Sequence, residues 1–248
     1  MTSQKKLPQV IFEQMPLEQE TEMIMGFLDE DWSDVIIKKF PQLLMIKSIK
    51  TEEEKRKTIK NEITNIRQEL GPKMDDGLLL VKDNWEKVEK NTLEALAEII
   101  QTDYPKRDIT AYISINPICP RFLNKWSFSV PPDHKNPNKT IAHEISHFLF
   151  FKKLKEEFPE IERGKYESPH KEWVLSEILA VIILCDNRLI KALNIPKYYG
   201  YYPKHQELKI NGELLSKSLE NLYDDMVIKK KNFTEFIKKS LELLKDLK

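Results

Sequence analysis

The segment His143-Glu-Ile-Ser-His147 constrains this chain more than any other part of the sequence. Residues four apart lie on the same face of an α-helix, so a helix here brings the two imidazoles together. Two imidazoles at that spacing can share one tetrahedral Zn²⁺, and Glu144 projects beside them, where it can accept a proton from a water at the metal. The segment therefore predicts a zinc-binding helix and a hydrolytic reaction, with His143 and His147 as ligands and Glu144 as the catalytic acid/base.

The residues around this motif match a longer pattern. Thr140 stands three residues before His143, and no Gly or Pro interrupts the predicted helix over residues 138–153. Uncharged side chains fill the remaining positions: Ile141, Ile145, Ser146, Phe148 and Leu149. In these residues the chain resembles the zincin metallopeptidases. The alternative is a chance match, with two surface histidines and a glutamate on an ordinary amphipathic helix.

The third zinc ligand must come from later in the chain, because a catalytic zinc keeps three protein ligands and one open position. Zincins that use a third histidine continue with Gly and His, but Phe150 and Lys153 occupy those positions here, which excludes that class. Glu177 lies inside the otherwise apolar segment 174–184. Burying a carboxylate there is costly unless a charge such as zinc compensates it. Glu177 is therefore the predicted third ligand, and the alternatives are Glu172 and His170.

The segment Ser176-Glu177-Ile-Leu-Ala180 resembles the sequence around the glutamate ligand of several gluzincins. The nearest comparison is with the small, single-domain minigluzincins, and it covers residues 74–190. One position departs from the thermolysin-like pattern: Val181 stands where those enzymes carry an acidic residue that orients a zinc histidine. Ligand histidines need such a partner, so Asp186 or a backbone carbonyl is expected to supply it.

The resemblance implies a zinc peptidase that binds one Zn²⁺ and hydrolyses a peptide or protein substrate. In this family a further Tyr or His usually stabilises the oxyanion. The segment Tyr198–His205 offers several such side chains, with no reason to prefer one. Its alternative is an aromatic turn packed on the surface. The alternative function for the whole chain is a catalytically silent zincin-fold binding or regulatory protein, or a helical scaffold with a chance motif.

Composition limits the partners and the compartment. The chain has 248 residues, with 40 basic and 40 acidic side chains and a formal net charge of zero. Bulk charge therefore predicts neither a nucleic-acid nor a membrane partner. Two distant cysteines, Cys119 and Cys185, favour free thiols in a reducing compartment. The N-terminus lacks the apolar run of a signal peptide, so the expectation is a cytoplasmic protein.

The hydrophobic pattern predicts a predominantly helical α+β fold that is zincin-like, with a small sheet above the active-site helix and a helical lower half. Helical periodicity covers residues 16–31 and 51–70, where Thr51 and Glu54 form a capping box and Gly71-Pro72 ends the helix. A long helical stretch over residues 74–102 follows. Strands are expected at 108–116 and 125–130. Residues 126–130 are the candidate rim of the substrate cleft, where an extended peptide could add as a strand.

The predicted domain organisation is a helical N-terminal extension, residues 1–72, followed by a zincin-like metallopeptidase domain, residues 73–248. Residues 73–155 form its upper part with the active-site helix, and residues 156–248 form its helical lower part. Residues 212–248 read as two amphipathic helices separated near 229–232. They either complete the lower half of the cleft or lie across it and inhibit the enzyme.

Overall fold

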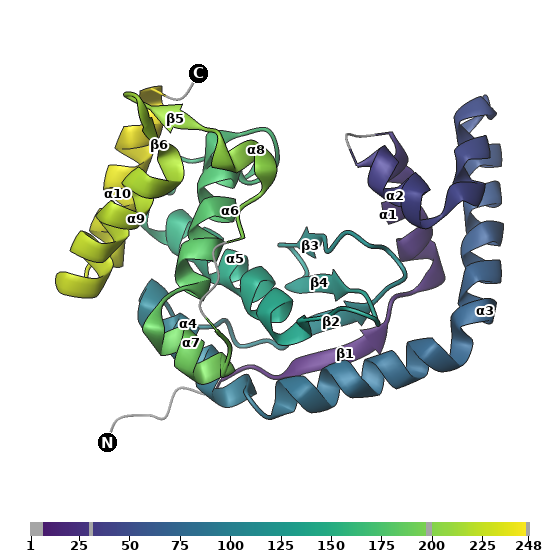
Figure 1. Ribbon diagram of the computed structural model, residues 1–248, viewed down its shortest axis with the longest axis horizontal. Helices are drawn as coiled ribbons and strands as arrows, with labels where there is room; N and C mark the ends of the chain where they lie inside the picture. The colour runs from purple at the N-terminus through teal and green to yellow at the C-terminus, as the bar shows by residue number, and fades with distance from the viewer. Residues whose placement is uncertain (1–6, 30–31, 197–199, 247–248) are drawn as a thin grey trace. The chain divides into compact units, whose positions relative to one another are not determined.

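The computed structural model describes residues 7–29, 32–196 and 200–246. The protein is mostly helical and carries a small mixed sheet, which confirms the predicted predominantly helical α+β class (Figure 1). Among the described residues, no helix combines the length and the apolar character needed to cross a membrane.

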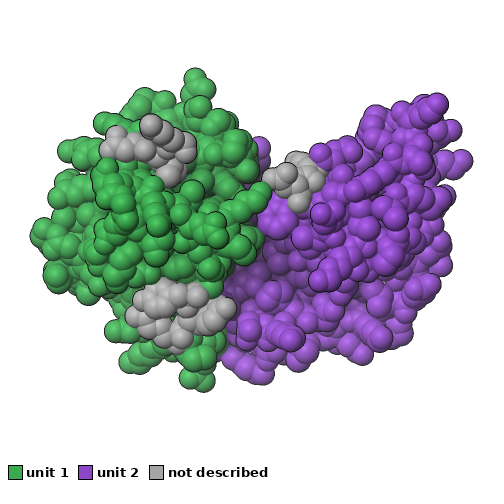
Figure 2. All heavy atoms as spheres, turned by 45° about the horizontal axis from the view of Figure 1, so that its top comes forward, with its two compact units in different colours: residues 1–8, 88–107, 142–248 green, residues 9–87, 108–141 purple. Residues whose placement is uncertain are grey.

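The chain forms two compact units, shown in green and purple in Figure 2. Unit 1 comprises Met1–Pro8, Val88–Arg107 and Ala142–Lys248, and unit 2 comprises Gln9–Lys87 and Asp108–Ile141. The division at residue 72 that the sequence suggested stays a prediction. All of the candidate zinc ligands belong to unit 1.

Unit 2 combines a sheet with helices from the N-terminal part of the chain. Strands β1, β2 and β4 run parallel, β3 pairs antiparallel with β4, and the order is β1-β2-β4-β3. The elements are β1 (Val10–Gln14), α1 (Leu17–Leu28), α2 (Ser33–Lys39), the 3₁₀ helix η1 (Pro41–Ser48), α3 (Glu52–Glu86), β2 (Ile109–Ile113), β3 (Arg121–Phe122) and β4 (Ser127–Val130).

The strands β2 and β4 confirm the two strands predicted from the sequence. Strand β1 was not predicted, although Val10-Ile-Phe12 is a short run of strand-forming residues just after Pro8. It pairs with β2 along its whole length, from Val10 opposite Ile109 to Gln14 opposite Ile113. Five residues are too few to show a periodic pattern of apolar side chains, so the strand is recognised only from its pairing with β2.

Helix α3 contradicts the predicted helix end at Gly71-Pro72, because it continues through Pro72 to Glu86. Thr51 caps its start, as predicted, and accepts a hydrogen bond from the backbone N–H of Glu54 at 3.3 Å. The residues buried along α3 keep helical spacing on both sides of the proline: Ile59, Ile63, Ile66, Met74, Gly77, Val81 and Trp85. Packing of this stripe holds the helix together. A proline inside a helix bends it, and α3 changes direction in Figure 1.

Unit 1 is built from the helices that follow. They are α4 (Glu89–Ile100), α5 (Pro137–Glu157, in unit 1 from Ala142), the 3₁₀ helix η2 (Arg163–Tyr166), α6 (Lys171–Leu184), α7 (Asn187–Leu193), α8 (Pro203–Gln206), α9 (Leu215–Tyr223), the π-helical turn η3 (Asp224–Lys229), α10 (Phe233–Leu243) and the 3₁₀ turn η4 (Leu244–Asp246), with a two-stranded hairpin of β5 (Lys209–Ile210) and β6 (Glu213–Leu214). The predicted stretch 74–102 is therefore not one helix: it breaks between Glu86 and Glu89, where unit 2 ends and unit 1 resumes.

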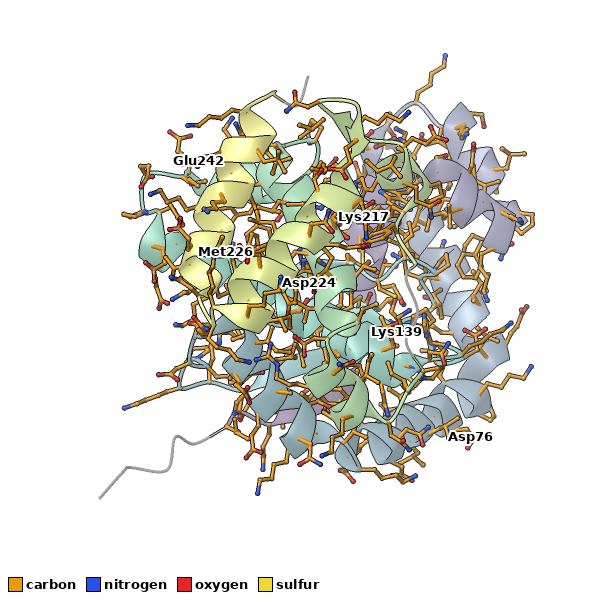
Figure 3. All side chains as sticks on the ribbon, turned by 60° about the vertical axis from the view of Figure 1, so that its left-hand side comes forward. Asp76, Lys139, Lys217, Asp224, Met226 and Glu242 are labelled. Atoms are coloured by element: carbon orange, nitrogen blue, oxygen red, sulfur yellow. The ribbon has the colours of Figure 1, made fainter. Side chains whose placement is uncertain are left out.

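The C-terminal helices confirm the two predicted amphipathic segments. Met226 of η3 is buried, whereas Lys217 of α9 and Glu242 of α10 are exposed (Figure 3). Helix α10 buries Phe233, Phe236 and Ile237 completely, so it forms part of the core of unit 1.

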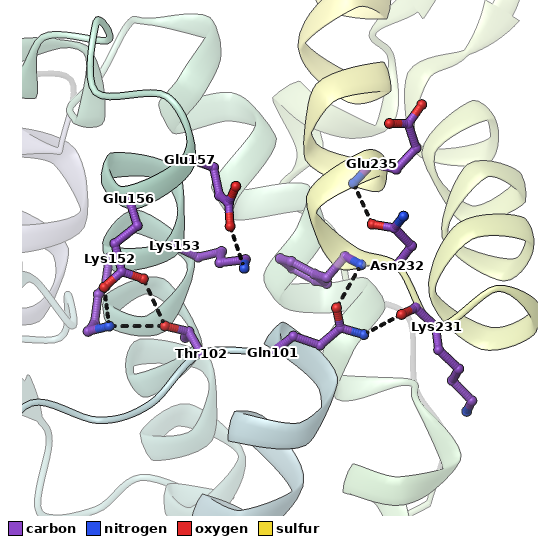
Figure 4. Close-up of polar contacts among 10 residues, drawn as sticks. Gln101, Thr102, Lys152, Lys153, Glu156, Glu157, Lys231, Asn232 and Glu235 are labelled. Atoms are coloured by element: carbon purple, nitrogen blue, oxygen red, sulfur yellow. Dashed lines mark hydrogen bonds and ion pairs between the residues drawn. The ribbon is translucent and has the colours of Figure 1, made fainter.

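Gln101, which ends α4, holds the start of α10. Its side chain donates to the backbone carbonyl of Lys231 at 2.8 Å and accepts from the backbone N–H of Phe233 at 3.2 Å (Figure 4). Beside it, the Lys152 ammonium on α5 donates to Glu156 and to the Thr102 hydroxyl, at 2.5 and 3.1 Å. These contacts tie α4 to α5 and to the C-terminal helix.

Candidate metal site

The motif helix forms as the sequence predicted. Helix α5 spans Pro137–Glu157 and covers the whole predicted segment. The residues that it buries around the motif include Ala142, Ile145, Phe148 and Leu149. Glu144 and His147 are buried with them, at 5% and 1% exposure, and the side chain of His143 is 20% exposed.

Helix α6 supplies the other side of the site. Every residue from Val174 to Leu184 is buried, including Glu177 at 5% exposure. A helix that is apolar on all sides is stable only when it is buried, and α6 lies inside unit 1 in contact with η2, α7 and α9. Its burial confirms that Glu177 is a carboxylate among apolar neighbours.

The two helices bring His143, His147 and Glu177 together. The Nε2 atoms of the two imidazoles are 3.0 Å apart. One carboxylate oxygen of Glu177 lies 3.6 Å from Nε2 of His143, and the other lies 3.6 Å from Nε2 of His147. The three residues offer one ligand atom each, all within 4.8 Å of one another. The sequence predicted this set of three, although Glu177 follows His143 and His147 by 34 and 30 positions.

These residues fit a zinc ion. Two imidazole nitrogens and one carboxylate oxygen are a ligand set that catalytic zinc uses. With ligand bonds of about 2.0–2.1 Å, tetrahedral geometry puts ligand atoms roughly 3.3 Å apart, which lies between the observed 3.0 and 3.6 Å. The 3.0 Å separation also suits a hydrogen bond between the two rings, if one ring carries a proton on Nε2 and the other does not. A measurement of metal binding distinguishes a zinc site from such a hydrogen bond.

Glu144 stands next to this group. Its Oε1 atom is 4.0 Å from Nε2 of His143, and the side chain is almost fully buried. This places a carboxylate beside the three candidate ligands without making it a fourth member of the set. The arrangement is the one that the five-residue motif predicted for a helical segment.

The alternative third ligands lie elsewhere. Glu172 is buried in the first turn of α6, and His170 precedes that helix as its N-cap residue. Among the described residues, the only group that could hold a metal consists of His143, His147 and Glu177. The structure thus brings Glu177, and neither alternative, to the two imidazoles.

Asp186 does not take the role expected for it as a partner of a zinc histidine. It caps α7, and its carboxylate accepts hydrogen bonds from the Arg188 side chain at 2.7 and 3.0 Å and from the Tyr223 hydroxyl at 2.8 Å. Burial opposes ionisation of Asp186, but the hydrogen bonds from Arg188 and Tyr223 outweigh it, so the pKa of Asp186 lies below its ordinary value. Asp186 therefore stabilises the junction of α7 and α9.

The structure describes part of the aromatic segment Tyr198–His205. Tyr198 and Tyr199 lie outside the described residues. His205, on α8, is 5% exposed, and its ring meets Trp173 of α6 edge-on, with centroids 5.3 Å apart. Burial lowers the pKa of His205, although the charge of Glu177 acts in the opposite direction.

Two further aromatic residues on the ligand-bearing helices were not singled out from the sequence. Trp173 lies four residues before Glu177 on α6, and Phe151 lies four residues after His147 on α5. The same helical spacing that identified the ligands could have identified both residues.

The predicted rim strand is β4 (Ser127–Val130), which belongs to unit 2. Its role in binding a substrate stays a prediction. Neither Cys119 nor Cys185, both among the described residues, forms a disulfide.

Comparison with protein-family models, with curated proteins and with solved structures finds no match to this chain. The candidate site therefore stands on its own residues and geometry.

Proposed function

We propose that this protein is a zinc-dependent peptidase. The observation that carries the proposal is the convergence of His143 and His147 of α5 with Glu177 of α6 into one group. The motif demanded a third ligand, and the buried carboxylate that the sequence singled out lies beside both imidazoles. A chance motif on a surface helix gives no reason for such a carboxylate to be there.

We further propose that the fold is zincin-like and that the site is of the gluzincin type. Support comes from the order of elements in the chain. A sheet strand, β4, precedes the motif helix α5, and a second helix, α6, carries the glutamate. The resemblance of residues 140–149 and 176–180 to gluzincin motifs points the same way.

In this proposal His143, His147 and Glu177 hold one Zn²⁺. When bound, zinc supplies Lewis acidity, which makes water easier to deprotonate and polarises an amide carbonyl. The two imidazoles bind as neutral rings through Nε2, and the Glu177 carboxylate offsets part of the cation's charge. The exposed side of His143 is where water and substrate reach the site.

Glu144 moves the protons of the reaction. Its carboxylate accepts a proton from the attacking water as the water oxygen bonds to the scissile carbonyl carbon. It then donates that proton to the nitrogen of the leaving amine as the C–N bond breaks. One water is consumed, and the products are a carboxylic acid and an amine. Burial of Glu144 beside the ligands keeps its carboxylate within reach of both events.

From the aromatic segment we propose His205 as the assisting residue, because its ring meets Trp173, which lies one helical turn before Glu177 on α6. Burial favours its neutral form, which still carries one ring N–H, and that N–H can donate to the developing oxyanion of the substrate. The rings of Trp173 and Tyr202 pack edge-on against His205, with centroids 5.3 and 5.7 Å away, and hold its orientation.

The substitution Glu144→Gln tests the reaction. It keeps the size of the side chain and removes the proton acceptor, so we expect zinc content to be unchanged and hydrolysis of a peptide library to fall by at least about a hundredfold. Cleavage products are measured by mass spectrometry. Undiminished cleavage by the variant would overturn the mechanism. A wild-type protein that binds zinc but cleaves nothing would instead indicate a catalytically silent zinc-binding protein.

A further inference from the structure

Three aromatic rings form a column that starts at a candidate zinc ligand. The ring of Phe151 stacks on that of His147, with centroids 6.4 Å apart and planes 19° apart. The ring of Tyr166 stacks on that of Phe151, with centroids 4.6 Å apart and planes 22° apart. All three side chains are buried, with exposures of 1%, 3% and 4%. The column links α5 to η2.

Tyr166 is the anchor of the connection between the two ligand-bearing helices. Residues 155–170 lead from the end of α5 to the start of α6, and all of them are described. Tyr166 is the one buried residue among them. A connection that is otherwise solvated thus inserts a single side chain into the protein, and that side chain packs on the ring that adjoins His147.

We infer that Phe151 and Tyr166 are positioning residues for His147 as a metal ligand, an inference that rests on the proposed zinc site. A ligand imidazole must keep its ring plane fixed so that Nε2 faces the metal, and an outer partner usually fixes it. Val181 occupies the position where an acidic partner was expected, and Asp186 is bonded to Arg188 and Tyr223. The near-parallel, offset ring of Phe151 limits how far the imidazole can rotate.

The geometry of the site agrees with this role. Nε2 of His147 points to His143 at 3.0 Å and to Glu177 at 3.6 Å, while the ring plane stays nearly parallel to Phe151. Offset stacking of this kind is a favoured arrangement of aromatic rings. Tyr166 in turn fixes Phe151, so loss of either outer ring frees the imidazole.

The experiment compares four variants of the full chain. Phe151→Leu and Tyr166→Leu remove a ring from the column, whereas Tyr166→Phe keeps the ring and removes only the hydroxyl. Phe150→Leu is the matched control, because it removes a buried ring of the same helix that is not stacked in the column: Phe150 meets Phe151 only edge-on, at 5.1 Å. Zinc affinity is measured by competition with a chromophoric chelator, and ligand geometry by the visible absorption of the Co²⁺-substituted protein.

Loss of a hydrogen-bonded outer partner of a ligand histidine costs roughly 10–100-fold in metal affinity, and we take the lower end of that range for a stacked ring. We expect about a tenfold weaker affinity and a changed Co²⁺ spectrum for Phe151→Leu and Tyr166→Leu, and wild-type values for Tyr166→Phe and Phe150→Leu. If Phe151→Leu does not fold, Tyr166→Leu carries the test, because it leaves α5 unchanged.

The inference is overturned if wild-type protein binds zinc and both leucine variants bind it equally well, or if Phe150→Leu weakens binding as much as they do. In those cases the proposed zinc site still stands. A wild-type protein that binds no zinc overturns the site and the positioning role together.

Discussion

Glu177, His147 and Asp186 show how far single residues can be assigned from this sequence. The first two were found because helical spacing and an apolar neighbourhood leave few explanations for them, and the structure brings them together. Asp186, one of the two partners considered for a zinc histidine, does not take that role. It is the N-cap of α7, and its carboxylate accepts a hydrogen bond from the side chain of Arg188, two residues later. The capping role of Asp186 is local and could have been predicted from the sequence. Its hydrogen bond with Tyr223 could not, because the two residues are far apart in the chain.

The Asp186 network makes a stability prediction. Replacement by Asn removes the charge that Arg188 and the buried Tyr223 hydroxyl engage, so we expect a loss of about 3 kcal/mol in the free energy of unfolding at pH 7. The pKa of Asp186 is lowered in the folded protein, so its carboxylate stabilises the fold above its unfolded pKa of about 3.9. That contribution is lost as the pH falls through the folded pKa.

Chemical denaturation of the wild-type protein and of Asp186→Asn, at pH 7 and near pH 3, tests the contribution of this carboxylate. The difference between wild type and Asp186→Asn should shrink on acidification. A difference of the same size at both pH values would show that the charge of Asp186 contributes nothing.

Elements with a sustained periodic pattern of apolar residues could be predicted from the sequence. Elements that depend on contacts between distant parts of the chain could not. Helices α5 and α6 and the two C-terminal helices follow their apolar patterns, and β2 and β4 lie within predicted strand segments. Helix α3 was cut short because Gly71-Pro72 is a usual helix end. The proline removes one backbone donor, but Gly71 has no Cβ to clash with the ring that follows it, and the buried stripe resumes at Met74. The packing that outweighs the proline comes from residues remote in sequence.

Gly77 of α3 gives a prediction with a matched control. A Cβ at this position would lie 2.8 Å from the carbonyl oxygen and 2.9 Å from Cα of Pro132, the loop residue that follows β4. Gly77→Ala must therefore push α3 away from that loop, and we expect a loss of about 1–3 kcal/mol in unfolding free energy.

The control is Gly26→Ala in α1, where nothing lies within 4 Å of the added methyl group. Alanine is the better helix former, so we expect a gain of about 0.5–1 kcal/mol there. Urea denaturation measures both. Equal effects at the two positions would contradict the close packing of α3 against Pro132.

In the whole molecule, the proposed zinc site couples function to the folding of one unit. The three ligands come from α5 and α6, and all three belong to unit 1, together with the C-terminal helices that complete its core. An ion that binds the folded state alone stabilises it by mass action, so loss of metal should loosen the contact between these helices. Helix α10 buries three large side chains in the same unit. Trimming it to test autoinhibition would therefore remove core packing.

The most direct test is the zinc content of the purified full-length protein after loading with Zn²⁺ and dialysis. We expect about one zinc per chain, lost in Glu177→Gln and retained in Glu172→Gln, which alters a second buried glutamate of the same helix. Wild-type protein without zinc, or Glu177→Gln protein that binds zinc as well as wild type, would contradict the assignment of His143, His147 and Glu177 as a metal site.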